Sequence, residues 1–466
     1  MTHSHVAGSI HADVASRAPS WLGYPSDVND LLQRLWSSGV TKDGDGLLSV
    51  AGVDVRQIAE QVGTPAYVVD EDDLRSRARR FAEAFEGWEV YYAAKSFICT
   101  AVARWVAEEG LGVDVCTGGE LAVALRAGVD PRRIGLHGNN KSLAELRAAL
   151  DAGVGRIIVD SFDEIHRLGE LAAELQRRPR VMVRVTTGVE AHTHEYIATA
   201  HEDQKFGFSI AGGTAAEALR ACFKHPDLEL IGIHSHIGSQ IFDTEGFEVA
   251  ARRTLRLHAE FARETGVELA ELDLGGGFGI AYTSMDTPSE PEDLAAALRS
   301  IITAECQALE VAVPHLSIEP GRSISGPAAF ALYRVGTVKP VALDGGFTRL
   351  YVAVDGGMSD NIRTALYAAE YSATLASRRS EAPPALSRVV GKHCEGGDIL
   401  VRDEFLPADI AAGDLIAVPA SGAYSRSMAS NYNHVPRPPV VSVKDGVITT
   451  LIRRETLDDL LALDVG

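Results

Sequence analysis

Short apolar runs alternate with helical patterns through the middle of the chain. Eight runs rich in β-branched and apolar residues lie between Glu89 and Glu319, at 90–94, 113–116, 134–137, 157–160, 181–185, 231–236, 272–274 and 316–319. Stretches rich in Ala, Leu, Glu and Arg separate them, with clear helical spacing over 121–126, 143–152, 164–176 and 247–265. This alternation predicts an α/β protein with a (β/α)8 barrel of the TIM type, and an open doubly wound sheet is the alternative.

The pattern changes after Gly326-Pro327. Strand-like runs follow at 331–341, 349–354, 388–390, 415–418 and 440–453, and Lys444-Asp445-Gly446 favours a hairpin turn. These runs predict a second, β-rich domain with a sandwich-like or barrel-like form. We therefore expect a loosely ordered extension over 1–25, an N-terminal segment over 26–65 that contributes to the β-domain, the barrel over 66–326, and the C-terminal β-domain over 327–466.

Composition narrows the classes of partner. The 466 residues are enough for two domains. Asp and Glu total 64 against 44 for Lys and Arg, a formal charge of −20 that opposes nucleic acid or an anionic membrane as partner. No apolar run in the sequence approaches the roughly 18 residues of a spanning helix. Five widely spaced cysteines, none with metal-ligand spacing, indicate a reducing compartment, so we expect a cytoplasmic protein without a metal site.

Residues with chemical roles fall at or just past the ends of the eight predicted strands. They are Lys95, Cys116, His137, Asp160, Arg184, His236, Gly275 and Glu319. Chemistry in (β/α)8 barrels takes place on this carboxyl-end rim, whereas mid-strand positions that pack the core are apolar. The pattern therefore predicts an active site on the rim.

Three signatures on that rim suit one cofactor. They are His234-Ser235-His236-Ile237-Gly238-Ser239-Gln240, Leu274-Gly275-Gly276-Gly277-Phe278-Gly279 and Glu319-Pro320-Gly321-Arg322. The glycine run offers bare N–H groups to a phosphate, and Arg322 and Ser239 could add a guanidinium and a hydroxyl. A carboxylate at Glu319 would keep a pyridine nitrogen protonated, and His236 could stack on the ring.

Lys95 completes this set because its amine could form an imine with an aldehyde. Together the residues predict a site for pyridoxal 5′-phosphate. Each has a plainer interpretation when taken alone: a surface lysine, a tight glycine turn, a glutamate that caps a helix, and a histidine satisfied in the core.

The predicted β-domain carries further candidates. Cys394, flanked by His393 and Glu395, could return a proton to a carbanion, although a structural cysteine is the commoner case. Arg363 and Tyr367, one helical turn apart, could recognise a substrate carboxylate, and the plainer alternative is a solvated helix face.

These residues resemble the fold-type III family of pyridoxal-phosphate-dependent decarboxylases, and most closely its diaminopimelate-decarboxylating members. The resemblance runs from Gly63-Thr64-Pro65-Ala66-Tyr67-Val68 to Ser421-Gly422-Ala423-Tyr424. It includes Tyr92-Ala93-Ala94-Lys95, His137-Gly138-Asn139-Asn140-Lys141-Ser142 and Lys205-Phe206-Gly207 as well as the three signatures. The stretch before about Leu48 is not explained by the match.

The resemblance implies a role for each candidate. It implies a Schiff base on Lys95, His236 against the cofactor ring, and Glu319 at the pyridine nitrogen. For the phosphate it implies Ser239, Gly275, Gly276, Gly277 and the segment Glu319, Pro320, Gly321 and Arg322. Tyr424 would touch both cofactor and substrate. The family's homodimer would bring Cys394, as proton donor, and Glu395, as ligand of the distal ammonium, from the neighbouring subunit.

The resemblance also implies a substrate, meso-2,6-diaminopimelate, converted to L-lysine and carbon dioxide in the last step of lysine biosynthesis. Arg322 and Arg363, with Tyr367, would hold the distal carboxylate, and two such arginines would repel a purely cationic end group. Two alternatives stay open. One is a related decarboxylase for ornithine, arginine or carboxynorspermidine, and the other is a catalytically silent binding homologue, which the presence of Lys95, Glu319 and Cys394 disfavours.

Overall fold

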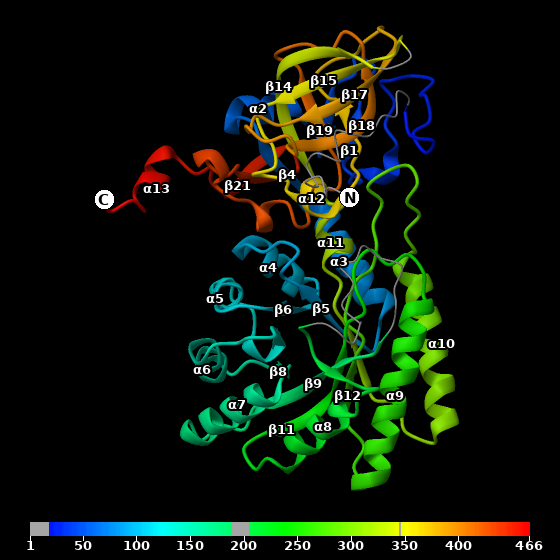
Figure 1. The fold of residues 1–466 in the computed structure, drawn as a ribbon, viewed down its shortest axis with the longest axis vertical. Coiled ribbons are helices and arrows are strands. Elements are labelled where there is room, and N and C mark those ends of the chain that lie inside the picture. The colour runs from blue at the N-terminus through cyan, green and yellow to red at the C-terminus, as the bar shows by residue number, and fades with distance from the viewer. Residues whose placement is uncertain (1–17, 189–204, 344–345) are drawn as a thin grey trace, which may run out of the picture. The chain divides into compact units, whose positions relative to one another are not determined.

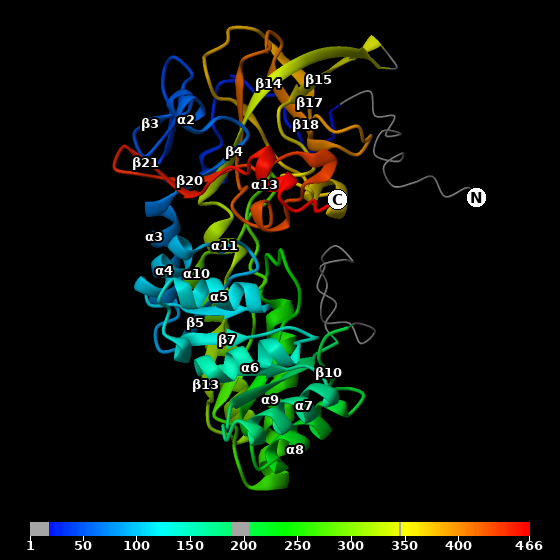
Figure 2. The ribbon, with the colours of Figure 1, turned by 90° about the vertical axis from the view of Figure 1, so that its left-hand side faces the viewer.

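The computed structural model describes residues 18–188, 205–343 and 346–466. Residues 1–17 of the predicted extension over 1–25 therefore lie outside the described residues. The chain divides into two units, which we call the β-domain (up to Leu74, Ile280–Thr287 and Ser325–Gly466) and the barrel unit (Arg75–Gly279 and Pro288–Ile324). Figures 1 and 2 show the elements of each.

Eight parallel strands of the barrel unit form a closed ring, which confirms the (β/α)8 prediction and excludes the open sheet. They are β5 (Glu89–Ala93), β6 (Gly112–Val115), β7 (Ile134–Leu136), β8 (Arg156–Val159), β9 (Arg180–Thr186), β11 (Glu229–Ser235), β12 (Glu271–Asp273) and β13 (His315–Ile318). Each pairs with the next in this order, and β13 pairs with β5. The short β10 (Phe208–Ser209) pairs with the end of β9. Strands β6, β7 and β8 are buried throughout, which explains their near-continuous apolar runs.

Helices lie outside these strands (Figure 1). They are α4 (Thr100–Glu108), α5 (Gly118–Arg126), α6 (Leu143–Ala152), α7 (Phe162–Glu174), α8 (Thr214–Lys224), α9 (Glu245–Thr265), α10 (Pro291–Leu309) and the short α11 (Arg322–Ser325), with a 3-10 turn η2 (Pro131–Arg133). The side chains of Thr117, Ser142 and Ser161 cap α5, α6 and α7 by accepting a hydrogen bond from the backbone N–H three residues on. Each such cap stabilises its helix by about 1 kcal/mol, so the rim loops that precede these helices end at defined residues.

The β-domain is built on one mixed sheet, whose strand order is β18-β17-β15-β14-β4-β20-β21; β19 pairs with β14, and β16 pairs with β19. Its strands are β4 (Ala66–Asp70), β14 (Ala329–Ala342), β15 (Thr348–Val354), β16 (Thr374–Leu375), β17 (Pro384–Val390), β18 (Ile399–Pro407), β19 (Leu415–Val418), β20 (Val440–Lys444) and β21 (Val447–Ile452). β20 and β21 form the predicted hairpin, with Asp445 and Gly446 both in the left-handed region at φ 50° and 76°.

Smaller elements complete the β-domain. A three-stranded sheet holds β1 (Val40–Lys42), β2 (Leu48–Val50) and β3 (Val53–Asp54), and the helices are η1 (Gln33–Leu35), α2 (Val55–Val62), α12 (Arg363–Tyr367), η4 (Arg426–Met428), η5 (Tyr432–His434) and α13 (Leu457–Leu461). Helix α3 (Glu71–Ala84) spans the boundary between the two units. Over 18–188, 205–343 and 346–466, no helix is both long and apolar enough to cross a membrane.

The unit boundaries differ from the sequence-based ones. The barrel was expected to begin at residue 66, yet β4 pairs with β14 and β20 of the β-domain sheet, and the barrel unit starts at Arg75. Ile280–Thr287 also belongs to the β-domain although it lies within the predicted 66–326 span. The apolar run of β4 marks a buried strand but carries no signal of the sheet that it joins, since all five residues are buried.

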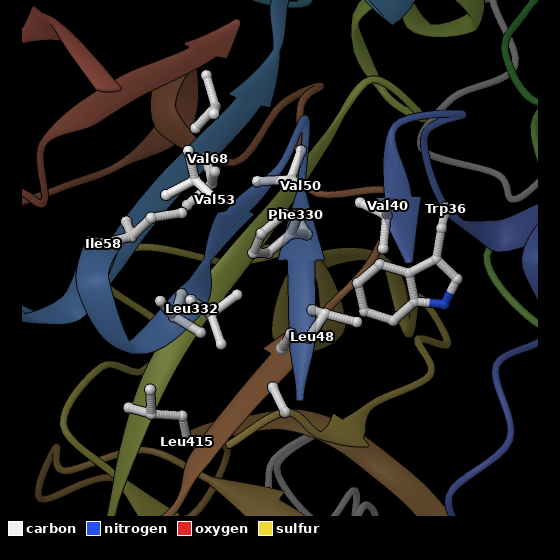
Figure 3. Packing of buried hydrophobic residues seen from close by; sticks show 14 of the residues in the cluster. Trp36, Val40, Leu48, Val50, Val53, Ile58, Val68, Phe330, Leu332 and Leu415 are labelled. Atoms are coloured by element: carbon white, nitrogen blue, oxygen red, sulfur yellow. The ribbon is translucent and has the colours of Figure 1, made fainter. Parts of the chain in front are cut away.

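The N-terminal segment packs into the core of the β-domain (Figure 3). Trp36 and Leu48 lie in one cluster with Phe330, Leu332 and Leu415, and the rings of Trp36 and Phe330 have centroids 5.8 Å apart. Burying a large apolar side chain of this kind stabilises a fold by roughly 1.5–3 kcal/mol. The segment is therefore an integral part of this core.

Candidate active site

A buried carboxylate lies at the centre of the barrel rim. Glu319 follows β13 and is 4% exposed. Its Oε1 lies 3.1 Å from Nε2 of His137, which follows β7, and 3.1 Å from Nε2 of His234 on β11. His137 Nε2 is also 2.5 Å from Oδ1 of Asp114 on β6. Four strands thus place one acid, two imidazoles and a second acid in contact.

Opposite charges decide how these groups ionise. Burial alone would raise the pKa of Glu319, but the adjacent His137 and His234 hold it well below its usual range. Burial alone would lower the pKa of His137, but Asp114 and Glu319 raise it to about 9. Burial, reinforced by Glu319, raises the pKa of Asp114 to about 6. Near neutral pH, Glu319 is therefore an anion beside a cationic His137.

His236 lies on the loop after β11 and is neutral. The backbone N–H of Gly276 donates to its Nδ1 at 3.2 Å, so this nitrogen carries no proton. Burial, and next the positive charge of Lys95, hold the pKa of His236 well below its usual range. The ring therefore presents an uncharged, flat surface at the rim.

The glycine loop after β12 packs closely against its neighbours. A Cβ on Gly276 would lie 2.1 Å from the carbonyl oxygen of Glu319, and one on Gly277 would lie 2.3 Å from that of Gly238. Only glycine fits at these two positions without displacing backbone. The loop after β12 is thereby wedged between the loops after β11 and β13, and its backbone runs unshielded by side chains.

Two polar side chains flank this loop. Arg322, the first residue of α11, is buried and donates from Nη2 to Ser239 Oγ at 2.8 Å. A guanidinium, a hydroxyl and bare backbone on adjoining loops are the groups that bind a phosphate.

Lys95 lies on the same rim, just after β5, and is half-buried. The backbone N–H of Ala93 donates to the carbonyl of Pro320 at 3.2 Å, which ties the end of β5 to the Glu319 loop. After burial, the charge of Lys95 is the next cause of the low pKa of His236, and it partly offsets the rise that burial and Glu319 cause in the pKa of Asp114. The barrel unit therefore brings together Lys95, His236 and Glu319.

The other predicted residues lie in the β-domain. Arg363, the first residue of α12, is 5% exposed; its Nη1 donates to Tyr371 Oη at 2.5 Å, and its guanidinium lies over the Tyr282 ring at 4.7 Å. Burial opposes its charge, but Tyr282 and Tyr371 raise the pKa of Arg363 above its ordinary value, and Tyr424 contributes to the rise. Tyr367 is half-buried at the last position of α12.

The loop that carries Cys394 has a fixed base and an exposed tip. Cys394 and Glu395 are exposed. The preceding His393 is buried, with Nε2 2.8 Å from Ser359 Oγ and Nδ1 3.1 Å from Asn433 Oδ1. Asp398 accepts the backbone N–H of His393 at 2.7 Å. A thiol and a carboxylate therefore project from a well-held loop.

Asp360 is buried and lies three residues before Arg363 in the chain. Tyr333 Oη donates to its Oδ1 at 2.5 Å and Gly357 N–H to its Oδ2 at 2.8 Å, yet burial raises the pKa of Asp360 to about 7. Because the folded chain holds this proton more tightly than the unfolded chain, the stability that it contributes in acid is lost as the pH rises through 7. Relative to wild type, Asp360→Asn should gain about 2–3 kcal/mol of unfolding free energy between about pH 5 and about pH 8. Urea unfolding of both proteins measures this, and a difference that does not change with pH would contradict it.

Comparison with known proteins decides the family. Residues 71–326 match the pyridoxal binding domain of the pyridoxal-dependent decarboxylases. Diaminopimelate decarboxylase of Mycobacterium tuberculosis is 54% identical over 94% of this chain and 100% of its own length, and that of Bacillus subtilis is 44% identical over 90% and 95%. The chain belongs to the diaminopimelate decarboxylase family.

Solved structures agree with this assignment. A diaminopimelate decarboxylase from M. jannaschii is 30% identical with a TM-score of 0.85, covering 92% of this chain and 98% of that one. One from Helicobacter pylori, complexed with L-lysine, is 29% identical with a TM-score of 0.80, covering 88% and 98%. As a diaminopimelate decarboxylase, the chain is a carbon–carbon lyase whose cofactor is pyridoxal 5′-phosphate, and the cofactor prediction is confirmed.

The rim residues of this diaminopimelate decarboxylase fit that cofactor. Oε1 of Glu319 is buried, and no group among the described residues gives it a well-aligned hydrogen bond, so it can accept one from a protonated ring nitrogen. His137, His234 and Glu319 are also, within the described part of the chain, the one group whose donor atoms could hold a metal ion, all lying within 4.8 Å of one another. An anionic carboxylate such as Glu319 also has the chemistry to face a protonated pyridine nitrogen.

Proposed function

We propose that this chain decarboxylates meso-2,6-diaminopimelate to L-lysine and carbon dioxide, the last step of lysine biosynthesis. The observation that carries the proposal is the match to diaminopimelate decarboxylases over their full length, at 54% identity. A structure of the M. jannaschii enzyme in co-complex with L-lysine, 32% identical to this chain, supports the product. Carbon dioxide release from meso-diaminopimelate, compared with ornithine and arginine, tests it. Release from ornithine or arginine alone would overturn it.

The barrel unit would hold the cofactor. The Lys95 amine would attach it covalently, the neutral His236 ring would face it, and Glu319 would keep its ring nitrogen protonated. Ser239, Gly275, Gly276, Gly277 and the segment Glu319, Pro320, Gly321 and Arg322 would bind its phosphate. The support is the charge on Glu319, the absence of charge on His236, and the close-packed glycine loop beside Arg322.

Bound pyridoxal phosphate supplies an electron sink for the pair left on Cα when the carboxylate departs as carbon dioxide. Glu319 would stabilise this state, because a buried carboxylate facing the ring nitrogen would keep its charge in a site that excludes water. The Sγ proton of Cys394 would then go to Cα, which yields L-lysine, and solvent would restore the thiol. Tyr424 would contact both cofactor and substrate.

Arg363 would bind the distal carboxylate of the substrate, together with Arg322 and Tyr367, and Glu395 would bind the distal ammonium. Among the described residues, Arg363 pairs with no carboxylate; its neighbours are tyrosines. A buried guanidinium without a counter-ion is costly, and an incoming carboxylate relieves that cost. This supports a substrate with an acidic distal end over ornithine, arginine or carboxynorspermidine.

Arg363→Met tests this assignment. We expect the KM for meso-diaminopimelate to rise at least about tenfold with a smaller change in kcat, because a charge-assisted contact contributes about 1.5–3 kcal/mol. Arg363→Lys retains the charge but loses the two-pronged guanidinium, so its KM should lie between those of wild type and Arg363→Met. Steady-state carbon dioxide release measures both constants. An unchanged KM in Arg363→Met would remove Arg363 from the substrate site.

We also propose that the chain acts as a cytoplasmic homodimer in which each active site takes Cys394 and Glu395 from the partner. The support is that this loop has a rigid base and an exposed thiol, as a group donated to another chain requires. None of the five cysteines, all of which lie in the described residues, forms a disulfide, which suits a reducing compartment.

A further inference from the structure

One imidazole lies between two buried carboxylates on the barrel rim. His137 Nε2 is within ion-pair distance of both Asp114 and Glu319, at 2.5 and 3.1 Å. All three side chains are at most 5% exposed. The proposed chemistry uses Glu319 and assigns no task to the other two.

Other charges at this level either have their own partners or contact only one of the acids. Arg156 on β8 is fully buried and is paired with Asp273 and Ser317, and its charge also acts on Asp114 and Glu319 without a direct contact to either. His234 contacts Glu319 at 3.1 Å and has no second carboxylate beside it among the described residues. Lys95 acts on Asp114 through its charge. His137 is thus the cation with a direct contact to each of the two acids, at 2.5 and 3.1 Å.

The position of His137 is itself held firmly. Its backbone N–H donates to the carbonyl of Val115 at 2.7 Å. Just beyond it, Lys141 Nζ donates to the carbonyls of Gly138 and Ile158 at 2.7 and 2.6 Å and to Glu164 at 2.6 Å. The backbone of the loop after β7 is therefore held in place on both sides of His137.

Two buried carboxylates that share a site cannot both ionise readily. With a cation between them, each keeps its negative charge. Without that cation, one proton would be shared by the pair, and Glu319 would be neutral for part of the time.

We propose that His137 is a positioning residue: as an imidazolium bridging Asp114 and Glu319, it keeps Glu319 ionised and thereby keeps the cofactor's ring nitrogen protonated. This inference rests on the proposed function, in which Glu319 meets that nitrogen. It assigns Asp114 a supporting role, since the second acid stabilises the imidazolium.

A cycle of variants tests the inference with pyridoxal 5′-phosphate labelled with 15N in its ring. In the wild-type holoenzyme the ring 15N shift should report a protonated nitrogen near neutral pH. His137→Asn should move the ring 15N shift toward that of neutral pyridine. It should also weaken cofactor binding to the apoprotein about tenfold, which corresponds to a change of about one unit in the pKa of Glu319. Asp114→Asn alone should have a smaller effect.

The double variant His137→Asn/Asp114→Asn separates a packing role from a charge role. A packing role predicts that the second substitution adds to the loss, whereas a charge role predicts that it restores the 15N shift and the affinity. Adding Asp114→Asn to His137→Asn removes the repulsion, so the double variant should recover most of the 15N shift and of the affinity. His234→Asn is the matched control: it also loses a 3.1 Å contact to Glu319, but Asp114→Asn should not rescue it. A double variant no better than His137→Asn would overturn the inference, because His137 would then act only by packing.

Two further outcomes are informative. If His137→Asn does not fold, 15N titration of His137 in the wild-type apoprotein decides the question. A His137 pKa above the ordinary range of histidine, and a lower pKa in Asp114→Asn, would support the inference. An imidazole that is neutral near pH 7 would overturn it. If the wild-type chain fails to bind pyridoxal phosphate, the proposed function itself is wrong. If it binds and only the variant cycle fails, the role of His137 alone is wrong.

Discussion

Lys95→Ala is expected to release almost no carbon dioxide from meso-diaminopimelate, with kcat reduced by at least about a thousandfold. The reason is that the chain would lose the amine to which the cofactor is attached, while the rest of the rim would remain in place. The variant should also lose the visible absorption band of the bound cofactor. In the wild type, borohydride reduction followed by peptide mass analysis should place the cofactor on Lys95.

Lys224→Ala serves as the control for this result. Lys224 is an exposed lysine at the end of α8, so its loss should change neither the rate nor the absorption band. Full turnover by Lys95→Ala, with the band retained, would show that the cofactor is attached elsewhere or that the reaction does not need it.

Cys394→Ala is expected to lower kcat by about 10²–10³ while changing KM for meso-diaminopimelate much less. The thiol would act after the carboxylate has left, so its loss slows the return of the proton more than it weakens binding. Lys392→Ala, an exposed neighbour on the same loop, should keep the wild-type rate. Equal losses in both variants would mean that the loop matters only for its shape.

Mixing Lys95→Ala with Cys394→Ala protein tests whether sites are shared. Each variant alone would lack one essential group in every site. If each site takes Cys394 from the partner subunit, half of the sites in a mixed dimer combine two intact groups, and activity returns. No recovery after subunit exchange has been verified would show that each chain supplies its own thiol.

The sequence carried most of the fold and of the cofactor site for a physical reason. Buried parallel strands require nearly continuous apolar runs, so all eight barrel strands were visible in the pattern. The glycines of the loop after β12 were equally visible, because no side chain fits between that backbone and the carbonyls of Gly238 and Glu319.

Other features depend on contacts that no local pattern records. β18 was not predicted because Arg402-Asp403-Glu404 breaks its apolar run, yet Asp403 is buried there and pairs with Arg349 of β15 at 2.8 Å. Two tyrosines contact Arg363, and Tyr282 is far in sequence from both Arg363 and Tyr371. The bridge from Asp114 through His137 to Glu319 joins three strands, and sequence analysis placed His137 on the rim without giving it a partner.

The order in which the chain is synthesised gives β4 an unusual history. Its partners in the sheet are β14 at Ala329–Ala342 and β20 at Val440–Lys444. Both edges of β4 therefore stay unpaired until the entire barrel has emerged from the ribosome. During that interval a strand whose first four residues are apolar lacks hydrogen-bond partners and is a template for unwanted pairing. Fragments cut after the barrel should therefore aggregate, and a fragment that retains β4 together with residues 325–466 is the better starting point for isolating the β-domain.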